Sequence, residues 1–355
     1  MKRSNRLSAG LVLLLFLAGC NLPASAPTPD LFATLQAATP LMVSPPAPAV
    51  TLDPNLPTLI AVPPTLLTGD PIPAPLPTDG LAGHIVFTCQ MFKAQYSEQV
   101  CIMNADGTGY RRLTTENGVR HFYPSLAPDG KSMLYSQFRE QNIYEIYEYQ
   151  LSDGSVNQLT DKIGLATAPD VSPDGKSITF MRWTAANNQY QVWLMDRDGK
   201  NAARVAKVLG WDPTWSPSGE QILFAATDTD GRNQLFVVNK DGSSQHKISD
   251  LPSIRGRSDW SPDGKYIVTY SGAPWNREVY VMNADGSGVR QLTPTGGNSQ
   301  GPSFSPDGKW VVFTAYFDKY GDDHGCEIYV IRVDGSDLRR LTNNNYCDYQ
   351  PRWGP

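Results

Sequence analysis

Three titratable residues of this sequence lie where an acid and a base could act on one substrate. Asp212, His121 and Asp348 fall in segments that lead into recurring strands. Such groups facing one site would permit general acid–base chemistry, as in a glycan lyase or hydrolase. The chain lacks a Gly-x-Ser-x-Gly turn, so a serine hydrolase of the α/β type has no support. We predict no catalytic residue and keep the lyase or hydrolase as an alternative.

Signatures of metals and cofactors are equally sparse. The sequence has no His-Glu-x-x-His motif, no Cys-x-x-Cys motif and no phosphate-binding glycine loop. Asp228-Thr229-Asp230-Gly231 and the acidic stretch Asp318 to Asp323 offer oxygen ligands for Ca²⁺, but neither matches the twelve-residue calcium loop. We predict neither a metal nor a cofactor.

A short turn tag recurs along the chain and indicates the elements that hold these residues. Its five copies end at Gly130, Gly175, Gly219, Gly264 and Gly308, which lie 45, 44, 45 and 44 residues apart, and Trp353-Gly354-Pro355 is a sixth, truncated copy. A period of 40 to 50 residues is typical of repeated supersecondary units, and this size suits one four-stranded propeller blade.

Each repeat reads as four strands joined by turns. A β-branched and aromatic strand follows the tag, and a second such strand ends in an Asp-Gly turn, which supplies the positive φ angles of tight hairpins. Six Asp-Gly turns, from Asp106-Gly107 to Asp334-Gly335, predict six blades. The chain enters the repeats in a second strand at Ile85 and ends in a first strand at Trp353, so the two terminal strands should complete one blade and close the ring. We therefore predict an all-β fold in which residues 81–355 form one six-bladed β-propeller.

The Leu-Thr, Ser-Pro-Asp-Gly-Lys and Asn-Ala-Asp-Gly pattern resembles the C-terminal propeller of the TolB family and related WD-like repeats. The resemblance covers essentially all of residues 81–355 and implies the propeller fold. The TolB family has an α/β domain before its propeller, a place that a proline-rich segment takes here.

The two turn tags share one face of the predicted ring, and the longer, variable loops share the other. The variable loops are rich in aromatic residues, which suit the binding of a polypeptide or carbohydrate when they surround a concave rim. Packing against blade edges is the alternative for these side chains. We predict these binding residues near the channel mouth: His121, Tyr123, Trp211, Asp212, Arg255, Arg257, Gln300, Asp348 and Tyr349.

Four cysteines lie within the predicted repeats. Cys89 ends a strand and Cys101 lies in its antiparallel neighbour, whereas Cys326 and Cys347 lie in loops of the variable face. Four cysteines allow three connectivities, of which this placement favours Cys89–Cys101 and Cys326–Cys347. Buried free thiols are the alternative, and an oxidising compartment favours the disulfides.

The first 19 residues are typical of an export signal. Lys2, Arg3 and Arg6 precede an apolar run too short to span a bilayer. Leu17-Ala18-Gly19-Cys20 resembles the bacterial lipoprotein cleavage box, which implies lipid on Cys20. An ordinary signal peptide is the alternative. We predict an exported chain whose lipid anchors it to the membrane, facing the periplasm or the cell exterior.

A proline-rich segment follows the lipidation site. Residues 21–80 contain 15 of the 29 prolines and no Lys or Arg, so residues 20–80 should form a disordered, semi-extended tether. Without the signal the chain has 27 basic and 35 acidic residues, a net charge of −8. This balance and the absence of a basic cluster in the sequence argue against a nucleic-acid partner.

These features together favour a binding protein. We predict a monomeric, membrane-anchored propeller that binds a protein or glycan through its variable face. The propeller lyase or hydrolase is the first alternative, and a structural spacer without a specific ligand is the second. Because the repeated turns are structural, we expect specific chemistry only on the variable face.

Overall fold

The structure is a computed structural model that describes residues 81–91, 98–116, 118–186, 188–317 and 325–355. These residues fall within the second of two units that the chain contacts define, Ala61–Pro355. The export signal, Cys20 and the proline-rich segment lie outside the described residues, as do Phe92, Tyr96, Tyr320 and the acidic residues Asp318, Asp322 and Asp323.

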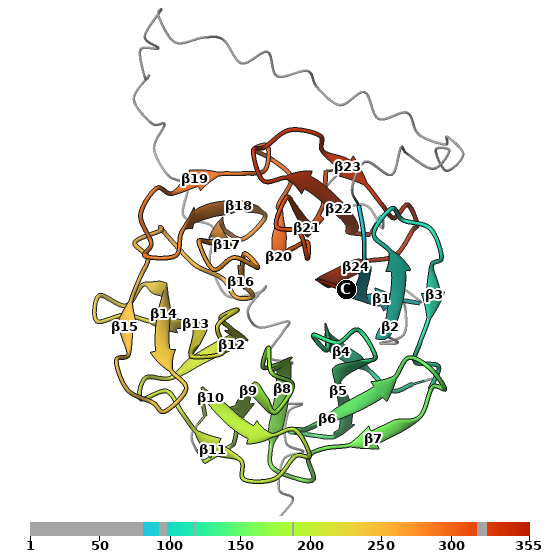
Figure 1. The fold of residues 1–355 in the computed structure, drawn as a ribbon, viewed down its shortest axis with the longest axis vertical. Coiled ribbons are helices and arrows are strands. Elements are labelled where there is room, and N and C mark those ends of the chain that lie inside the picture. The colour runs from blue at the N-terminus through green and yellow to red at the C-terminus, as the bar shows by residue number, and fades with distance from the viewer. Residues whose placement is uncertain (1–80, 92–97, 117, 187, 318–324) are drawn as a thin grey trace, which may run out of the picture. The chain divides into compact units, whose positions relative to one another are not determined.

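The described residues form antiparallel sheets arranged around a common centre, an all-β propeller without helices (Figure 1). The first sheet contains β24 (Asp348–Gly354), β1 (His84–Gln90), β2 (Glu98–Asn104) and β3 (Arg111–Arg112). Three further four-stranded sheets are β12 (Gly210–Trp215), β13 (Gln221–Thr227), β14 (Asn233–Asn239) and β15 (His246–Lys247); β16 (Asp259–Trp260), β17 (Tyr266–Ala273), β18 (Asn276–Asn283) and β19 (Arg290–Gln291); and β20 (Gln300–Phe304), β21 (Trp310–Ala315), β22 (Glu327–Arg332) and β23 (Arg339–Arg340).

The remaining strands belong to one eight-stranded sheet. It contains β4 (His121–Leu126), β5 (Ser132–Glu140), β6 (Ile143–Gln150), β7 (Val156–Gln158), β8 (Leu165–Val171), β9 (Ser177–Trp183), β10 (Tyr190–Asp196) and β11 (Ala203–Arg204). Its two halves, β4–β7 and β8–β11, are joined by a single parallel pair, Tyr144 opposite Leu165. Each half repeats the strand order of the four-stranded sheets.

The turn tags form through local hydrogen bonds that their sequence dictates. In the second copy the Ser172 hydroxyl donates to Asp174 at 2.7 Å, and the backbone N–H of Lys176 donates to the same carboxylate at 3.1 Å. The Ser172 hydroxyl also accepts the N–H of Ser177 at 2.9 Å. Gly175 has a φ of 73°, which an L side chain rarely adopts. The tag is therefore a structural turn, and its repetition sets the spacing of the strands.

A second repeated contact fixes the outer edge of most sheets. The Thr160 hydroxyl accepts the backbone N–H of Ile146 at 2.9 Å and donates to the Glu145 carboxylate at 2.5 Å. The same pair of bonds recurs at these Thr or Ser residues: Thr114, Ser249, Thr293 and Thr342. The Leu-Thr signature thus ends the outer strand because its hydroxyl satisfies the neighbouring strand.

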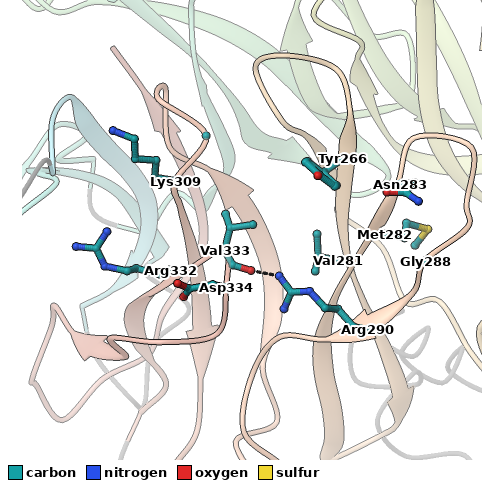
Figure 2. Close-up of a pocket in the computed structure, with 11 residues that line it drawn as sticks. Tyr266, Val281, Met282, Asn283, Gly288, Arg290, Lys309, Arg332, Val333 and Asp334 are labelled. Atoms are coloured by element: carbon teal, nitrogen blue, oxygen red, sulfur yellow. Dashed lines mark hydrogen bonds between the residues drawn. The ribbon is translucent and has the colours of Figure 1, made fainter.

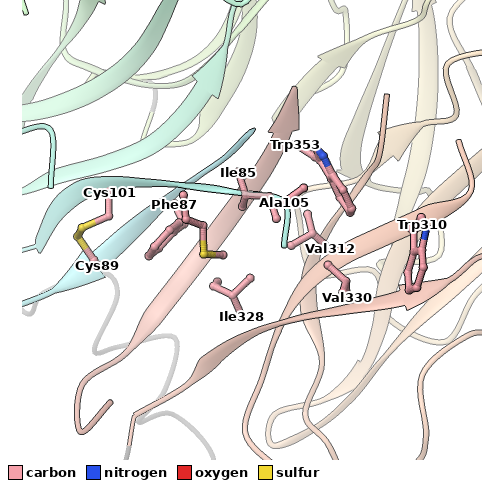
Figure 3. Close-up of a cluster of buried hydrophobic side chains, with 11 residues drawn as sticks. Ile85, Phe87, Cys89, Cys101, Ala105, Trp310, Val312, Ile328, Val330 and Trp353 are labelled. Carbon is pink, nitrogen blue, oxygen red and sulfur yellow. A yellow bond between two sulfur atoms is a disulfide. The ribbon is translucent and has the colours of Figure 1, made fainter. Parts of the chain in front are cut away.

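The terminal strands pair as the sequence predicts. β1 and β24 are antiparallel, with Ile85 opposite Trp353 and Cys89 opposite Asp348. Trp353 packs with Ile85 and Trp310 in a buried cluster that joins the first sheet to β20–β23 (Figure 3). The residues before the tags are buried in every repeat, which confirms their assignment to the core: Leu126, Val171, Trp215, Trp260, Phe304 and Trp353.

Both predicted disulfides are present. Cys89 and Cys101 join β1 to β2 with their Cα atoms 5.8 Å apart. Cys326 and Cys347 join the start of β22 to the residue before β24, with Cα atoms 4.3 Å apart. The second disulfide therefore ties the β20–β23 sheet to the strand that completes the first sheet.

Candidate functional site

A repeated β-bulge shapes the innermost strands. The register shifts in β4, β8, β12, β20 and β24, where each strand has a residue with positive φ followed by proline: Tyr123, Ala168, Asp212, Gly301 and Gln350. A bulge leaves one residue out of the ladder and re-aims its side chain. These five positions lie at the inner ends of successive sheets, so the repeat presents one variable side chain from each strand toward the same region.

Arg257 connects three of these inner strands. It precedes β16, is 5% exposed, and donates to the carbonyl oxygens of Pro124 at 3.0 Å and Gln350 at 3.2 Å. Its guanidinium lies 5.4 Å from the ring centroid of Tyr123. The side-chain oxygen of Gln350 accepts the N–H of Tyr123 at 3.0 Å and the hydroxyl of Thr88 at 3.0 Å. These contacts make a buried polar centre from strands that lie far apart in the sequence.

Asp212 places a carboxylate in the same region. It is 8% exposed, and its Oδ1 atom has no hydrogen-bond partner among the described residues. Burial raises the pKa of the Asp212 carboxyl to about 6, and the Arg257 and Arg352 guanidinium groups oppose that shift. Burial in turn lowers the pKa of Arg257 to about 9. A carboxyl with this pKa changes charge near neutral pH and can accept a hydrogen bond from a bound group.

Gly256 leaves the space that Asp212 occupies. A Cβ atom at Gly256 would lie 2.3 Å from the Asp212 Oδ2 atom and 3.1 Å from the Tyr270 hydroxyl. Any larger residue would therefore displace the carboxylate. Burial raises the pKa of the Tyr270 hydroxyl, and the Asp212 carboxylate adds to that effect.

Aromatic side chains surround this polar centre. Phe122, Tyr123, Ala168 and Met181 form a buried cluster, and partly buried aromatic residues pack against it: Tyr144, Tyr190, Trp211 and Tyr349. The Trp211 indole donates to the Arg255 carbonyl at 3.4 Å. Trp275, in the turn between β17 and β18, is 51% exposed and lies edge-on to Tyr316 at 5.8 Å. The variable face thus has both packed and exposed aromatic residues.

A ring of polar residues lies two positions after the bulges. The Asp170 carboxylate accepts the Ser125 hydroxyl, the Thr214 hydroxyl and the Trp215 N–H, each at 2.9 Å. The Asp259 carboxylate does the same for the Ser303 hydroxyl at 2.7 Å and the Phe304 N–H at 3.0 Å. Each aspartate therefore bonds to the next sheet along the chain.

The structure brings together some predicted binding residues and separates others. Tyr123, Trp211, Asp212, Arg257 and Tyr349 gather around one centre, with Arg255 bonded to Trp211. His121, 1% exposed, lies beside the Tyr135 ring at 5.5 Å. Gln300 accepts a bond from Arg277 at 2.8 Å.

Asp348 lies in a separate buried carboxylate pair. It is 1% exposed and accepts a bond from the Asn344 amide at 2.8 Å. Burial raises the pKa of the Asp348 carboxyl to about 7, and the nearby Glu327 carboxylate raises it further. The three acid–base candidates, Asp212, His121 and Asp348, have different polar partners, and His121 and Asp348 are interior residues.

Several residues of the centre escaped sequence analysis. Gln350, Tyr190 and Tyr270 lie among the predicted residues, yet none was singled out. The recurring proline after each bulge, as in Gln350-Pro351, was the available signal.

Metal ligands do not gather in the described part of the chain. No group of three or more His, Cys, Asp or Glu residues there could hold an ion. In the Asp228 loop the carboxylate accepts the backbone N–H groups of Asp230 and Arg232, at 3.0 and 2.9 Å. The same ranges contain no helix long and apolar enough to cross a membrane.

Similar proteins place this architecture among known ones. A solved structure of TolB from Acinetobacter baumannii has a TM-score of 0.67 at 24% identity, covering 78% of this chain and 67% of that one. A putative TolB from Agrobacterium tumefaciens has a TM-score of 0.58 at 19% identity, covering 77% of this chain and 98% of that one. These likenesses show the fold.

Sequence relatives lead to the same group. An uncharacterized protein of Agrobacterium fabrum is 29% identical over 48% of this chain, which spans 61% of that protein. The Tol-Pal system protein TolB of Alcanivorax borkumensis is 31% identical over 23% of this chain, which spans 19% of that protein. The family described as TolB beta propeller domain matches residues 83–253 and 186–355. The chain therefore belongs to the TolB β-propeller domain family.

Proposed function

We propose that the ring has six blades and is closed by its two terminal strands. The single residue pair between β6 and β8 supports counting the eight-stranded sheet as two blades, because each half repeats the order of the other sheets. The pairing of β1 with β24 supports closure. A closed ring holds the inner bulges in a fixed array, which a binding site needs.

We propose that this propeller is a non-catalytic binding protein whose partner is a polypeptide held at the variable face. The observation that supports this most is the buried Asp212–Arg257 centre enclosed by Tyr123, Trp211 and Tyr349. Aromatic side chains beside fixed charges and carbonyls are typical of interface anchors. The relatives named Tol-Pal system proteins belong by name to a protein system, which agrees with a protein partner.

We propose that the chain is exported and held at the membrane by lipid on Cys20, with residues 20–80 as the tether. The Cys89–Cys101 and Cys326–Cys347 disulfides support export, because such bonds persist in oxidising compartments. A tethered, monomeric propeller would reach partners in the periplasm or at the cell exterior. In this arrangement the lipid supplies location and the ring supplies recognition.

An enzymatic role at the centre is the second candidate. The Asp212 carboxyl is buried, has an oxygen without a partner, and has a pKa raised to about 6 by that burial, which are properties of a general acid. A glycan ligand with turnover would support this reading over polypeptide binding. A spacer without a ligand remains the third reading.

Affinity capture from the native cell envelope, paired with a glycan array, tests these readings. The comparison uses Trp275→Ala on the variable face and Tyr266→Ala, whose side chain is 41% exposed on the tag face. We expect the wild type and Tyr266→Ala to enrich one polypeptide at least tenfold over Trp275→Ala, with equal thermal midpoints. Equal capture by both variants contradicts the proposed face, glycan turnover supports the enzyme, and no enrichment by the wild type supports the spacer.

A further inference from the structure

A cavity of about 510 Å³ lies on the tag face, where the β16–β19 sheet meets the β20–β23 sheet (Figure 2). Its walls come from the ends of β18 and β22 and from the turns beside them. The sequence predicts specific chemistry only on the opposite face, so the position of this cavity corrects that expectation.

Three cationic side chains line the cavity. Arg290 begins β19, Lys309 follows a turn tag, and Arg332 ends β22. Figure 2 shows Lys309 and Arg332 on the wall formed by one sheet, with Tyr266 and Met282 on the wall formed by the other. Residues that lie up to 42 positions apart in the sequence therefore make a local basic cluster in an acidic protein.

Contacts with neighbours hold the two guanidinium groups in place. Arg290 donates to the Val333 carbonyl oxygen across the boundary between the sheets (Figure 2). The Arg332 guanidinium stacks 4.3 Å from the Trp310 ring centroid and pairs with Asp337 at 3.3 Å. A guanidinium has five N–H donors, so these contacts orient each group and leave donor capacity for a ligand.

The acidic residue of the cavity is engaged in its own turn. Asp334 accepts the Ser336 N–H at 2.9 Å and the Ser336 hydroxyl at 2.6 Å. The pKa of Asp334 is lowered mainly by the Ser336 hydrogen bond, so its charge persists at neutral pH. Three cations against one carboxylate leave the cavity net positive.

The repeat itself does not require these cations. The residue at the register position of Arg332 is uncharged or acidic in the other five repeats: Asn104, Gln150, Asp196, Asn239 and Asn283. The residue at the position of Lys309 in the β12–β15 sheet is Glu220. Only the boundary between β16–β19 and β20–β23 combines an arginine, a lysine and a second arginine at these three positions.

We propose that this cavity binds a small organic anion, whose carboxylate or phosphate group lies among Arg290, Lys309 and Arg332 and whose apolar body contacts Val281, Met282 and Tyr266. Arginine forms charge-assisted and bidentate hydrogen bonds with such oxyanions. Volumes of 300–1,000 Å³ are typical of small-molecule sites, and a half-exposed Tyr266 ring offers a stacking surface. This site is independent of the polypeptide site, because the two lie on opposite faces.

Calorimetric titration of the folded protein with phenyl phosphate tests the proposal, with phenol and inorganic phosphate as the two partial probes. The test variant is Arg290→Gln with Lys309→Gln. The matched control is Lys265→Gln, because Lys265 occupies the tag position equivalent to Lys309 and pairs with its own Asp263 at 3.0 Å. Benzoate replaces phenyl phosphate in a second series, which distinguishes a carboxylate ligand from a phosphate ligand.

We expect phenyl phosphate or benzoate to bind the wild type and Lys265→Gln equally, and the double variant about tenfold more weakly or worse. Phenol should bind at least tenfold more weakly than either anion, since it lacks the charge. Thermal midpoints should be equal in all three proteins because the changed side chains are exposed. Equal anion affinity in the double variant and the wild type, an equal loss in Lys265→Gln, or no binding of either anion would overturn the proposal.

Discussion

The Arg257 guanidinium donates to the carbonyl oxygen of Gln350 at 3.2 Å, which joins the segment before β16 to the last strand of the chain. A second bond from the same side chain reaches the Pro124 carbonyl in β4 at 3.0 Å. One buried side chain thus satisfies backbone acceptors in two other sheets. Because a buried carbonyl without a donor is costly, Arg257 contributes to the stability of the inner ring as well as to its charge.

Replacing Arg257 with methionine should destabilise the folded protein by about 2 kcal/mol, because two buried carbonyl oxygens lose their donor. The same change removes a positive charge that favours ionised Asp212, so the pKa of Asp212 should rise further. Urea denaturation measures the first effect. Arg255→Met is the control, since Arg255 is half-buried and bonds to the single carbonyl of Gly272. A loss no larger than that of the control would contradict this role.

The acid pair beside the second disulfide predicts a pH dependence of stability. Burial raises the pKa of Asp348 from its ordinary 3.8 to about 7, with Glu327 as the next cause. Between these pH values the folded state binds the proton more tightly than the unfolded chain does. Stability contributed by this group is therefore complete below pH 4 and falls as the pH rises to 7.

Asp348→Asn should remove this loss. We expect the unfolding free energy of the variant, relative to the wild type, to rise by about 3 kcal/mol between pH 4 and pH 8. Asp174→Asn is the matched control of opposite sign, because its hydrogen bond from Ser172 lowers the pKa of Asp174 in the folded state. Denaturation curves across pH measure both effects, and parallel profiles for the wild type and Asp348→Asn would disprove the shift.

The predictable part of this molecule is the part that local chemistry determines. The tag turn is made by residues two to five positions apart, such as Ser172, Asp174 and Ser177, so the sequence indicates it directly. Cysteine pairing followed from strand order, because Cys89 and Cys101 lie in adjacent antiparallel strands. The all-β propeller could therefore be inferred from repetition and turn chemistry alone.

The sites were harder to predict because their residues meet only after the sheets close around a centre. Arg257 bonds to carbonyls 93 and 133 residues away, and no local pattern specifies that convergence. His121 and Asp348 lie in the expected loops, yet the strand alternation directs both side chains into the interior. Arg290 and Arg332 belong to different repeats, so their cluster is invisible as a basic run.

Asp170 offers the sharpest test of how neighbouring sheets are coupled. Its carboxylate accepts bonds from Ser125 in β4 and from Thr214 and Trp215 in β12, each at 2.9 Å. Asp170→Ala removes all three and leaves two hydroxyls and one N–H without their acceptor. Hydrogen bonds to a charged group contribute more than neutral ones, so we expect a loss of about 3 kcal/mol in unfolding free energy.

The control for Asp170 is Asp174→Ala in the same repeat. Asp174 also accepts three hydrogen-bonding groups' worth of local contacts from Ser172 and Lys176, but they lie within one exposed turn and water replaces them. Chemical denaturation should therefore show a clearly smaller loss for Asp174→Ala. Asp170→Asn should fall between the two, since its amide oxygen keeps an acceptor. If Asp170→Ala cost no more than Asp174→Ala, the aspartate would not couple the sheets, and the hydrophobic clusters between them would have to hold the ring alone.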